Sequence, residues 1–188
     1  MSRKGAAMRG KYRDFVRIEG AVLLILAAAM TIPFILALYY REKASACAFA
    51  AVAAFCVLAG VMIRIAFKPS QEKFKSRDGF FVVSLTWLVC SIVGAMPFII
   101  SGAIPSFADA LFESCSGFST TGASILTDIE SLPKSVLFWR SFTHWLGGMV
   151  IIVFVMALLP VMGISVQMVA DAETPGPIKD KVTAHFSD

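Results

Sequence analysis

Four long apolar blocks alternate with short polar segments along the chain. They run from Ile18 to Tyr40, from Ala44 to Phe67, from Gly79 to Ile100 and from Val136 to Pro160. An α-helix rises ~1.5 Å per residue, so about 20 apolar residues are enough to cross a hydrocarbon core of ~30 Å. The pattern therefore predicts an all-α membrane protein with four transmembrane helices.

The first two blocks are expected to form an antiparallel transmembrane hairpin, because only Arg41-Glu42-Lys43 separates them. The basic residues that precede the first block leave a cleaved signal peptide as the alternative. The apolar core of a signal peptide is usually ~7–15 residues long. The first block is longer than that, which favours a transmembrane helix.

A further apolar stretch, from Pro105 to Ser116, is too short to cross a membrane. A run of small and polar residues from Gly117 to Ser124 follows it, and then Asp128, Glu130 and Pro133 mark an aqueous loop. This order is typical of a re-entrant helix with a pore loop, and a plain polar turn between two helices is the simpler alternative. The predicted fold is therefore a hairpin followed by one helix–pore loop–helix repeat.

The run from Gly117 to Ser124 has the chemistry to hold a dehydrated cation. Irregular backbone at membrane depth is tolerated only where it is buried in protein or lines a water-filled path. Carbonyl oxygens in such a loop can replace the water around the ion. Gly122 can adopt backbone angles that other residues avoid, and the short helix points its negative C-terminal end toward the middle of the membrane.

Basic residues predict the orientation of the helices. If every block crosses, eleven Lys and Arg lie on one side and four on the other. The excess marks the cytoplasmic side, so the N-terminus and the tail are expected inside and the pore loop enters from outside. The acids between the third and fourth blocks then face outward, where they attract cations. These acids are Asp109, Glu113, Asp128 and Glu130.

Composition and motifs exclude several other classes of protein. Only 16% of the residues are charged, whereas a soluble domain carries about a quarter. The net charge of +4 flanks the apolar blocks instead of forming a stripe with aromatics, which argues against nucleic-acid binding. The four cysteines form no CxxC pair, so a disulfide framework or a zinc site is not expected. No HExxH, GxSxG, Walker A or Rossmann motif indicates an enzyme or a cofactor.

The stretch from Phe112 to Ser124 resembles the first pore loop of the Trk/Ktr/HKT superfamily of potassium transporters, and most closely the Trk-type membrane subunit. The resemblance extends over most of the chain, although the last residues, 182–188, do not continue it. Five more segments carry it: Lys75–Phe80, Gly94–Phe98, Ser131–Pro133, Trp145–Met149 and Pro175–Asp180.

The resemblance implies a pore built from four such repeats, each supplying one quarter of a selectivity filter. The carbonyls of Thr120, Thr121 and Gly122 would bind K⁺, with Ser119 and Ala123 at the edges of the filter. In this superfamily a glycine at the Gly122 position accompanies potassium selectivity, and a serine accompanies sodium permeation. This chain carries one quarter, so the remaining repeats or copies of itself must complete the pore. A homotetrameric channel and a non-conducting truncated fragment are the alternatives.

The resemblance also implies a setting for the chain. Related subunits form homodimers in the bacterial inner membrane and associate with a cytosolic nucleotide-binding regulatory ring. The expected organisation is a cytoplasmic N-terminus (1–17), the hairpin (18–67), a cytoplasmic linker (68–78), the first repeat (79–160) with pore helix and filter at 105–124, and a truncated cytoplasmic tail (161–188).

Side chains around the loop suggest supporting roles. Glu113 and Arg140 are candidates for an ion pair that holds the filter in shape, and the alternative is that Arg140 extends to the membrane interface beside Trp139. His144 is expected to pack between helices instead of binding an ion. Gly147 and Gly148 are expected to allow close helix contact, with a gating hinge as the alternative.

Overall fold

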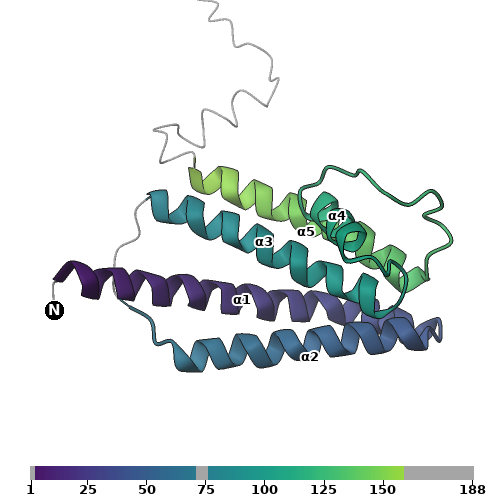
Figure 1. Cartoon of the computed structure of the whole chain (residues 1–188), viewed down its shortest axis with the longest axis horizontal. Helices are drawn as coiled ribbons and strands as arrows, with labels where there is room; N and C mark the ends of the chain where they lie inside the picture. Colours follow the sequence, from purple (N-terminus) through teal and green to yellow (C-terminus); the bar gives the residue numbers. More distant parts are fainter. Residues whose placement is uncertain (1–2, 71–75, 159–188) are drawn as a thin grey trace, which may run out of the picture. The chain divides into compact units, whose positions relative to one another are not determined.

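Five α-helices make up the described part of the chain. The computed structural model describes residues 3–70 and 76–158, with side chains over 10–70 and 78–152, and no strand lies in these ranges. The prediction of an all-α protein is confirmed. In chain order the helices are α1 (Arg3–Tyr39), α2 (Lys43–Ala66), α3 (Ser76–Ile100), α4 (Phe107–Phe118) and α5 (Lys134–Leu158), as Figure 1 shows.

The chain divides into two compact units, and the boundary falls inside α5. The first unit, Met1–Val150, holds α1 to α4 and the first part of α5. The second unit, Ile151–Asp188, is described only over its helical residues 151–158. The linker residues 71–75 and the predicted tail lie outside the described residues. The contacts among α1 to α4 and the first part of α5 lie within the first unit.

Three helices of the described chain are long and apolar enough to cross a membrane. These segments are Gly10–Tyr39, Lys43–Ala66 and Asp78–Ile100. Large apolar side chains stay on their surfaces, such as Ile65 of α2 at 74% exposure, as expected for helices that face lipid. Helix α5 is 25 residues long. The fourth span stays a prediction, because its apolar block runs past the described helix.

The starts of α1 and α4 differ from the predicted ones for identifiable reasons. Helix α1 begins at Arg3, well before the apolar block that starts at Ile18. Its basic first part is rich in good helix formers, and Asp14 ties it to the link after α2 by accepting hydrogen bonds from the backbone N–H of Ser70 (2.8 Å) and from its hydroxyl. Helix α4 begins at Phe107 because the preceding serine caps it.

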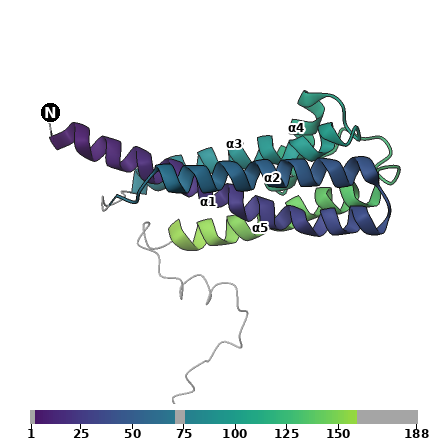
Figure 2. The ribbon, with the colours of Figure 1, turned by 90° about the horizontal axis from the view of Figure 1, so that it is seen from below.

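The turn between α1 and α2 is tight, and the two helices run antiparallel side by side (Figures 1 and 2). Arg41 adopts the left-handed conformation with a φ of 59°. Its N–H bonds to the carbonyl of Leu38 at 3.2 Å, and the N–H of Glu42 bonds to that of Ala37 at 2.8 Å. This pattern is a Schellman motif, which closes the C-terminus of α1 within three residues.

Two glycines allow α1 and α2 to touch near the far end of the hairpin. A methyl group at Gly60 would lie 2.7 Å from the backbone oxygen of Gly20. Arg17 of α1 reaches the C-terminus of α2 nearby, where its guanidinium donates to the carbonyls of Arg64 (3.1 Å) and Phe67 (2.8 Å). The last carbonyls of α2 therefore find their partners on α1.

Trp139 of α5 joins three helices. It is fully buried, and its indole Nε1 donates to the carbonyl of Gly94 in α3 at 3.0 Å. Its ring packs edge-on against Phe49 of α2, with ring centroids 6.1 Å apart. Close packing and hydrogen bonds of this kind hold helices together where lipid removes the hydrophobic driving force. The hairpin is thereby fixed to both helices of the predicted repeat.

The glycine contact between α1 and α2 gives a first prediction. We expect Gly60→Ala to lower the thermal unfolding midpoint of the detergent-solubilised protein, because the added methyl group would meet the backbone of Gly20. Overpacking of this kind costs ~1–3 kcal/mol. Gly79→Ala is the matched control, since a methyl group there would have no atom of the described residues within 4 Å beyond its chain neighbours and its own helix backbone. Equal midpoints for the two variants would contradict the contact.

Candidate functional site

Glycines on α3, on α5 and on α4 itself allow the short helix α4 to pack closely against its neighbours. A methyl group at Gly94 of α3 would lie 2.6 Å from the ring of Phe118, and one at Gly117 would lie 2.2 Å from the hydroxyl of Thr143 in α5. A methyl group at Gly147 of α5 would lie only 2.1 Å from the carbonyl oxygen of Phe118. The last turn of α4 is therefore fitted between α3 and α5 at backbone distance.

Helix α4 ends in a second Schellman motif. The N–H of Thr120 bonds to the carbonyl of Gly117 at 2.9 Å, and the N–H of Thr121 bonds to that of Ser116 at 3.0 Å. Thr120 occupies the left-handed position with a φ of 57°. A β-branched residue is strained in that conformation by about 1–3 kcal/mol. The surrounding contacts must therefore hold it in place.

The loop after α4 directs its N–H groups and its carbonyls to different partners. The N–H groups of Thr120 and Thr121 bond into α4, and that of Gly122, with a φ of 77°, makes a longer contact of 3.5 Å with the Ser116 carbonyl. Among the described residues, no donor reaches the carbonyls of these three residues. The carbonyl of Ala123, by contrast, accepts from Ser116 Oγ at 2.6 Å. Three consecutive carbonyl oxygens are thus available in an exposed loop.

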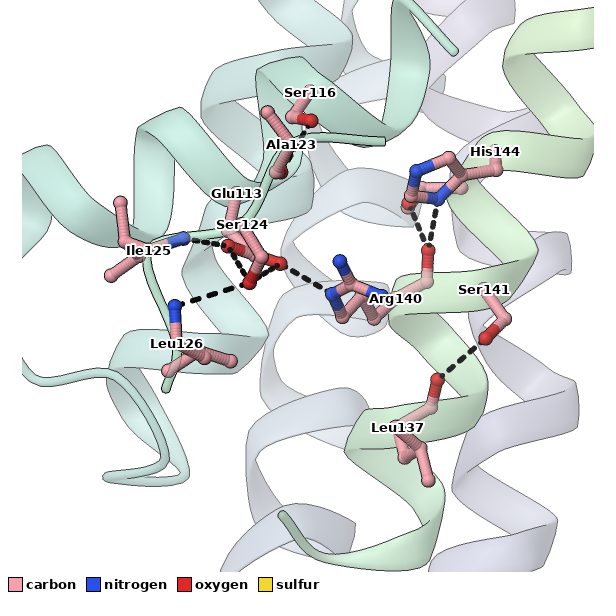
Figure 3. Close-up of polar contacts among 11 residues, drawn as sticks. Glu113, Ser116, Ala123, Ser124, Ile125, Leu126, Leu137, Arg140, Ser141 and His144 are labelled. Carbon is pink, nitrogen blue, oxygen red and sulfur yellow. Dashed lines mark hydrogen bonds and ion pairs between the residues drawn. The ribbon is translucent and has the colours of Figure 1, made fainter. Parts of the chain in front are cut away.

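Glu113 and Arg140 meet behind this loop (Figure 3). The Nε of Arg140 forms an ion pair with Glu113 Oε1, and their side chains are 13% and 1% exposed. The same carboxylate accepts from Ser124 Oγ, at 3.0 and 3.1 Å to its two oxygens, and from the N–H of Ile125 at 3.2 Å. Ser124 Oγ in turn accepts from the N–H of Leu126 at 3.1 Å. The network joins the middle of α4, the end of the loop and α5.

This network shows that Arg140 pairs with Glu113, as one of the two predictions for it required, whereas its role in supporting a filter stays a prediction. Arg140 turns to Glu113, and its neighbour Trp139 is fully buried, so the two do not form an aromatic and basic anchor at a membrane interface. A buried carboxylate without a partner would carry a large desolvation cost. Here the guanidinium, a hydroxyl and a backbone N–H share that charge.

The other predicted residues on α5 occupy distinct positions. His144 lies beside the loop, and its Nδ1 donates to the carbonyl of Arg140 at 2.9 Å, because a carbonyl can only accept (Figure 3). Gly147 makes the close helix contact expected of it, whereas Gly148 has room for a methyl group.

Sequence reasoning missed the part played by Ser116. Its hydroxyl and its carbonyl both bind the loop, at Ala123 and Thr121 respectively. The available signal was a small polar residue in the last turn of a short apolar helix, which also fits a residue that merely packs. The helix end was expected at Ser116, and the actual end at Phe118 places this serine inside the last turn.

Comparisons with known proteins identify relatives that cover most of the chain. Residues 45–185 match the family model for TrkH, described as a cation transport protein. The chain is 40% identical over 182 residues to the Trk system potassium uptake protein TrkH of Vibrio parahaemolyticus, covering 95% of this chain and 37% of that protein. It is 36% identical over 172 residues to the Trk system potassium uptake protein TrkG of Escherichia coli K12, covering 90% and 35%.

A solved structure agrees with these relatives. The crystal structure of the potassium transporter TrkH from Vibrio parahaemolyticus superposes with a TM-score of 0.75 at 37% sequence identity, covering 86% of this chain and 35% of that one. The chain thus spans about a third of the length of the relatives it matches.

The buried ion pair gives a second prediction. We expect Glu113→Gln and Arg140→Gln each to lower the free energy of unfolding, because each leaves the partner charge buried and unpaired. Removing one partner of a buried pair typically costs ~3–5 kcal/mol. The double variant should lose clearly less than the sum of the two, measured by denaturant unfolding in detergent. The exposed Glu130→Gln is the control, and strictly additive losses would contradict the coupling.

Proposed function

We propose that this chain, which belongs to the TrkH family of cation transport proteins, supplies one quarter of a potassium-conducting pore. The observation that carries the proposal is the row of three carbonyls at Thr120, Thr121 and Gly122, to which no residue in the described part of the chain donates. The resemblance of the loop and the names of the relatives support potassium as the ion.

The arrangement of the loop suits dehydrated K⁺. A potassium ion that leaves water needs oxygen ligands to replace its hydration shell, and backbone carbonyls serve this purpose in filters. With its N–H groups bonded into α4, the backbone presents the negative end of each peptide to the ion path. The C-terminal end of α4, which carries a partial charge of roughly −0.5, reinforces this preference for a cation.

The exposure of the loop supports a division of the pore among several such units. Ser119 to Ala123 are exposed in this chain, and one loop cannot surround an ion. The relatives are almost three times as long as the matched segment, which leaves room for further repeats. We therefore propose the first quarter of the filter for this segment, with three other loops completing it.

Gly122 is proposed as the residue most sensitive to substitution. Its φ of 77° is a conformation that other residues rarely adopt. A side chain there would strain the backbone between the carbonyls of Thr121 and Ala123 and alter the spacing of the ligands. The proposed preference for potassium over sodium depends on that spacing and on the number of carbonyls.

The proposed setting follows from charge bias and resemblance. We place the N-terminus and residues 161–188 in the cytoplasm of a bacterial cell, with the loop entered from outside. The proposed partners are a second subunit and a cytosolic nucleotide-binding ring. We also propose that the segments of the chain end at residues 17, 67, 78 and 160, as predicted from the sequence.

The third prediction tests ion conduction. In a bacterium deficient in potassium uptake, the complete protein that contains this segment should restore growth at limiting potassium. Gly122→Asp should abolish the rescue, because it distorts the carbonyl row and adds a charge. Thr127→Asp, an exposed position later in the same loop, adds the same charge outside the row and should retain the rescue. Membrane levels of each variant must be equal.

Two outcomes, one with the complete protein and one with residues 1–188 expressed alone in the same bacterium, would contradict parts of the proposal. Equal growth with Gly122→Asp and the unchanged protein would exclude this loop from the ion path. Rescue by residues 1–188 alone, lost in Gly122→Asp, would mean that copies of this segment assemble a pore by themselves.

The fourth prediction concerns selectivity. We expect Arg140→Gln and Glu113→Gln to reduce the preference for K⁺ over Na⁺ by at least about tenfold, which corresponds to ~1.4 kcal/mol, because Glu113 holds Ser124 and Ile125 at the end of the loop. The measurement is the ratio of ⁸⁶Rb⁺ to ²²Na⁺ uptake into proteoliposomes. Glu130→Gln should leave the ratio unchanged, and unchanged ratios in all three variants would remove the ion pair from filter support.

A further inference from the structure

Glu42 stands at the junction of α1 and α2, and its side chain serves neither helix. It is the last residue of the Schellman motif of α1 and the N-cap residue of α2. Its side chain makes no capping hydrogen bond to α2. The carboxylate instead reaches α5, where it accepts from the N–H of Lys134 at 2.7 Å, the N–H of Ser135 at 3.2 Å and the hydroxyl of Ser135.

Helix α5 has a local reason to need this partner. The carbonyl of Pro133 accepts the first helical hydrogen bond, from the N–H of Leu137 at 2.9 Å, so Pro133 is the N-cap residue. N-cap residues are usually Ser, Thr, Asp or Asn, whose side chains accept from the first free N–H groups. Proline has no such acceptor. Glu42, 92 residues before Lys134 in the chain, supplies it.

The start of α5 leads directly to the site. Arg140 lies six residues after Lys134, which is ~9 Å along the helix axis. Between them, Trp139 contacts Phe49, about two turns into α2 from Glu42. The hairpin therefore holds α5 at two points, and both lie just before the arginine that pairs with Glu113.

We infer that Glu42 is a positioning residue for the ion-binding loop: from the hairpin, its carboxylate caps the N-terminus of α5 and so sets the place of Arg140 behind that loop. This rests on the proposed function, since it assigns a role in a filter. The two-helix hairpin then has a role of its own, because it fixes the helix that supports the filter.

A different role for the same charge predicts different behaviour. A carboxylate that only attracts cations would act through its charge, and a neutral acceptor at the start of α5 could not replace it. A cap acts through the hydrogen bonds, so a neutral acceptor elsewhere in reach of the same N–H groups should replace it. Pro133→Ser creates such an acceptor at the N-cap of α5, in reach of the Ser135 N–H, because an N-cap side chain accepts from the second or third N–H of its helix.

The fifth prediction compares Glu42→Ala, Pro133→Ser and the double variant in the complete protein that contains this segment. Hydrogen exchange by mass spectrometry reads the amides of Lys134 and Ser135, and proteoliposome uptake reads the K⁺ over Na⁺ preference. In Glu42→Ala we expect roughly fivefold faster exchange, the effect of losing a cap of ~1 kcal/mol, and a lower preference for K⁺. The double variant should regain most of the protection at Ser135, which the new N-cap serine can reach, and most of the preference for K⁺. Glu130→Ala, which removes an exposed acid from the preceding loop, should change neither.

The remaining outcomes each overturn a stated part. Loss of K⁺ preference without faster exchange, or without recovery in the double variant, would make Glu42 a fixed charge instead of a cap. Faster exchange with unchanged K⁺ preference would make the cap irrelevant to the loop. If the unchanged protein takes up no K⁺, both the proposed function and the role of Glu42 are overturned. If the unchanged protein takes up K⁺ and the variants do not behave as predicted, only the role of Glu42 is overturned.

Discussion

The carbonyl of Ser116 receives the N–H groups of two successive loop residues, and the availability of the loop carbonyls depends on this arrangement. In a lipid environment each backbone N–H must find a partner within the protein or in a water-filled path. Bonding the N–H groups into the last turn of α4 satisfies them from one side of the loop. The carbonyl oxygens of Thr120 to Gly122 then accept no hydrogen bond from the described residues, and free carbonyl oxygens favour cations. The strained φ of Thr120 is a cost of this geometry.

Charged side chains in this chain act at the ends of helices other than their own. Arg17 of α1 closes the C-terminus of α2, and Glu42 closes the N-terminus of α5. Each places a charge at the helix end of opposite partial charge, which is the favourable sense. Arg140 of α5 and Glu113 of α4 instead pair between two helices. These charged groups therefore help to define how the helices meet.

Much of the fold could be predicted from the apolar blocks, because length and hydropathy are properties of a single segment. Helices α2 and α3 follow their blocks closely, and the short helix lies within two residues of its expected place. The long start of α1 could not be read from hydropathy, since its basic residues are helical but not apolar.

The candidate loop could be located from its small residues, but the contacts that shape it could not. The bond from Trp139 to Gly94 spans 45 positions, and the bond from Glu42 to Lys134 spans 92. Periodicity and composition carry no information on such distant pairs. Glycines such as Gly94 are also ambiguous in sequence, because flexibility and close packing call for the same residue.

Gly147 and Phe118 meet backbone to backbone, and this contact has a mechanical consequence. Side-chain contacts absorb small displacements by changing rotamer, but a Cα pressed against a carbonyl has no such freedom. A shift of α5 toward α4 at this point therefore meets the backbone of the last residue of α4 directly, immediately before the loop. The position of α5 at this contact thus limits where the loop can begin.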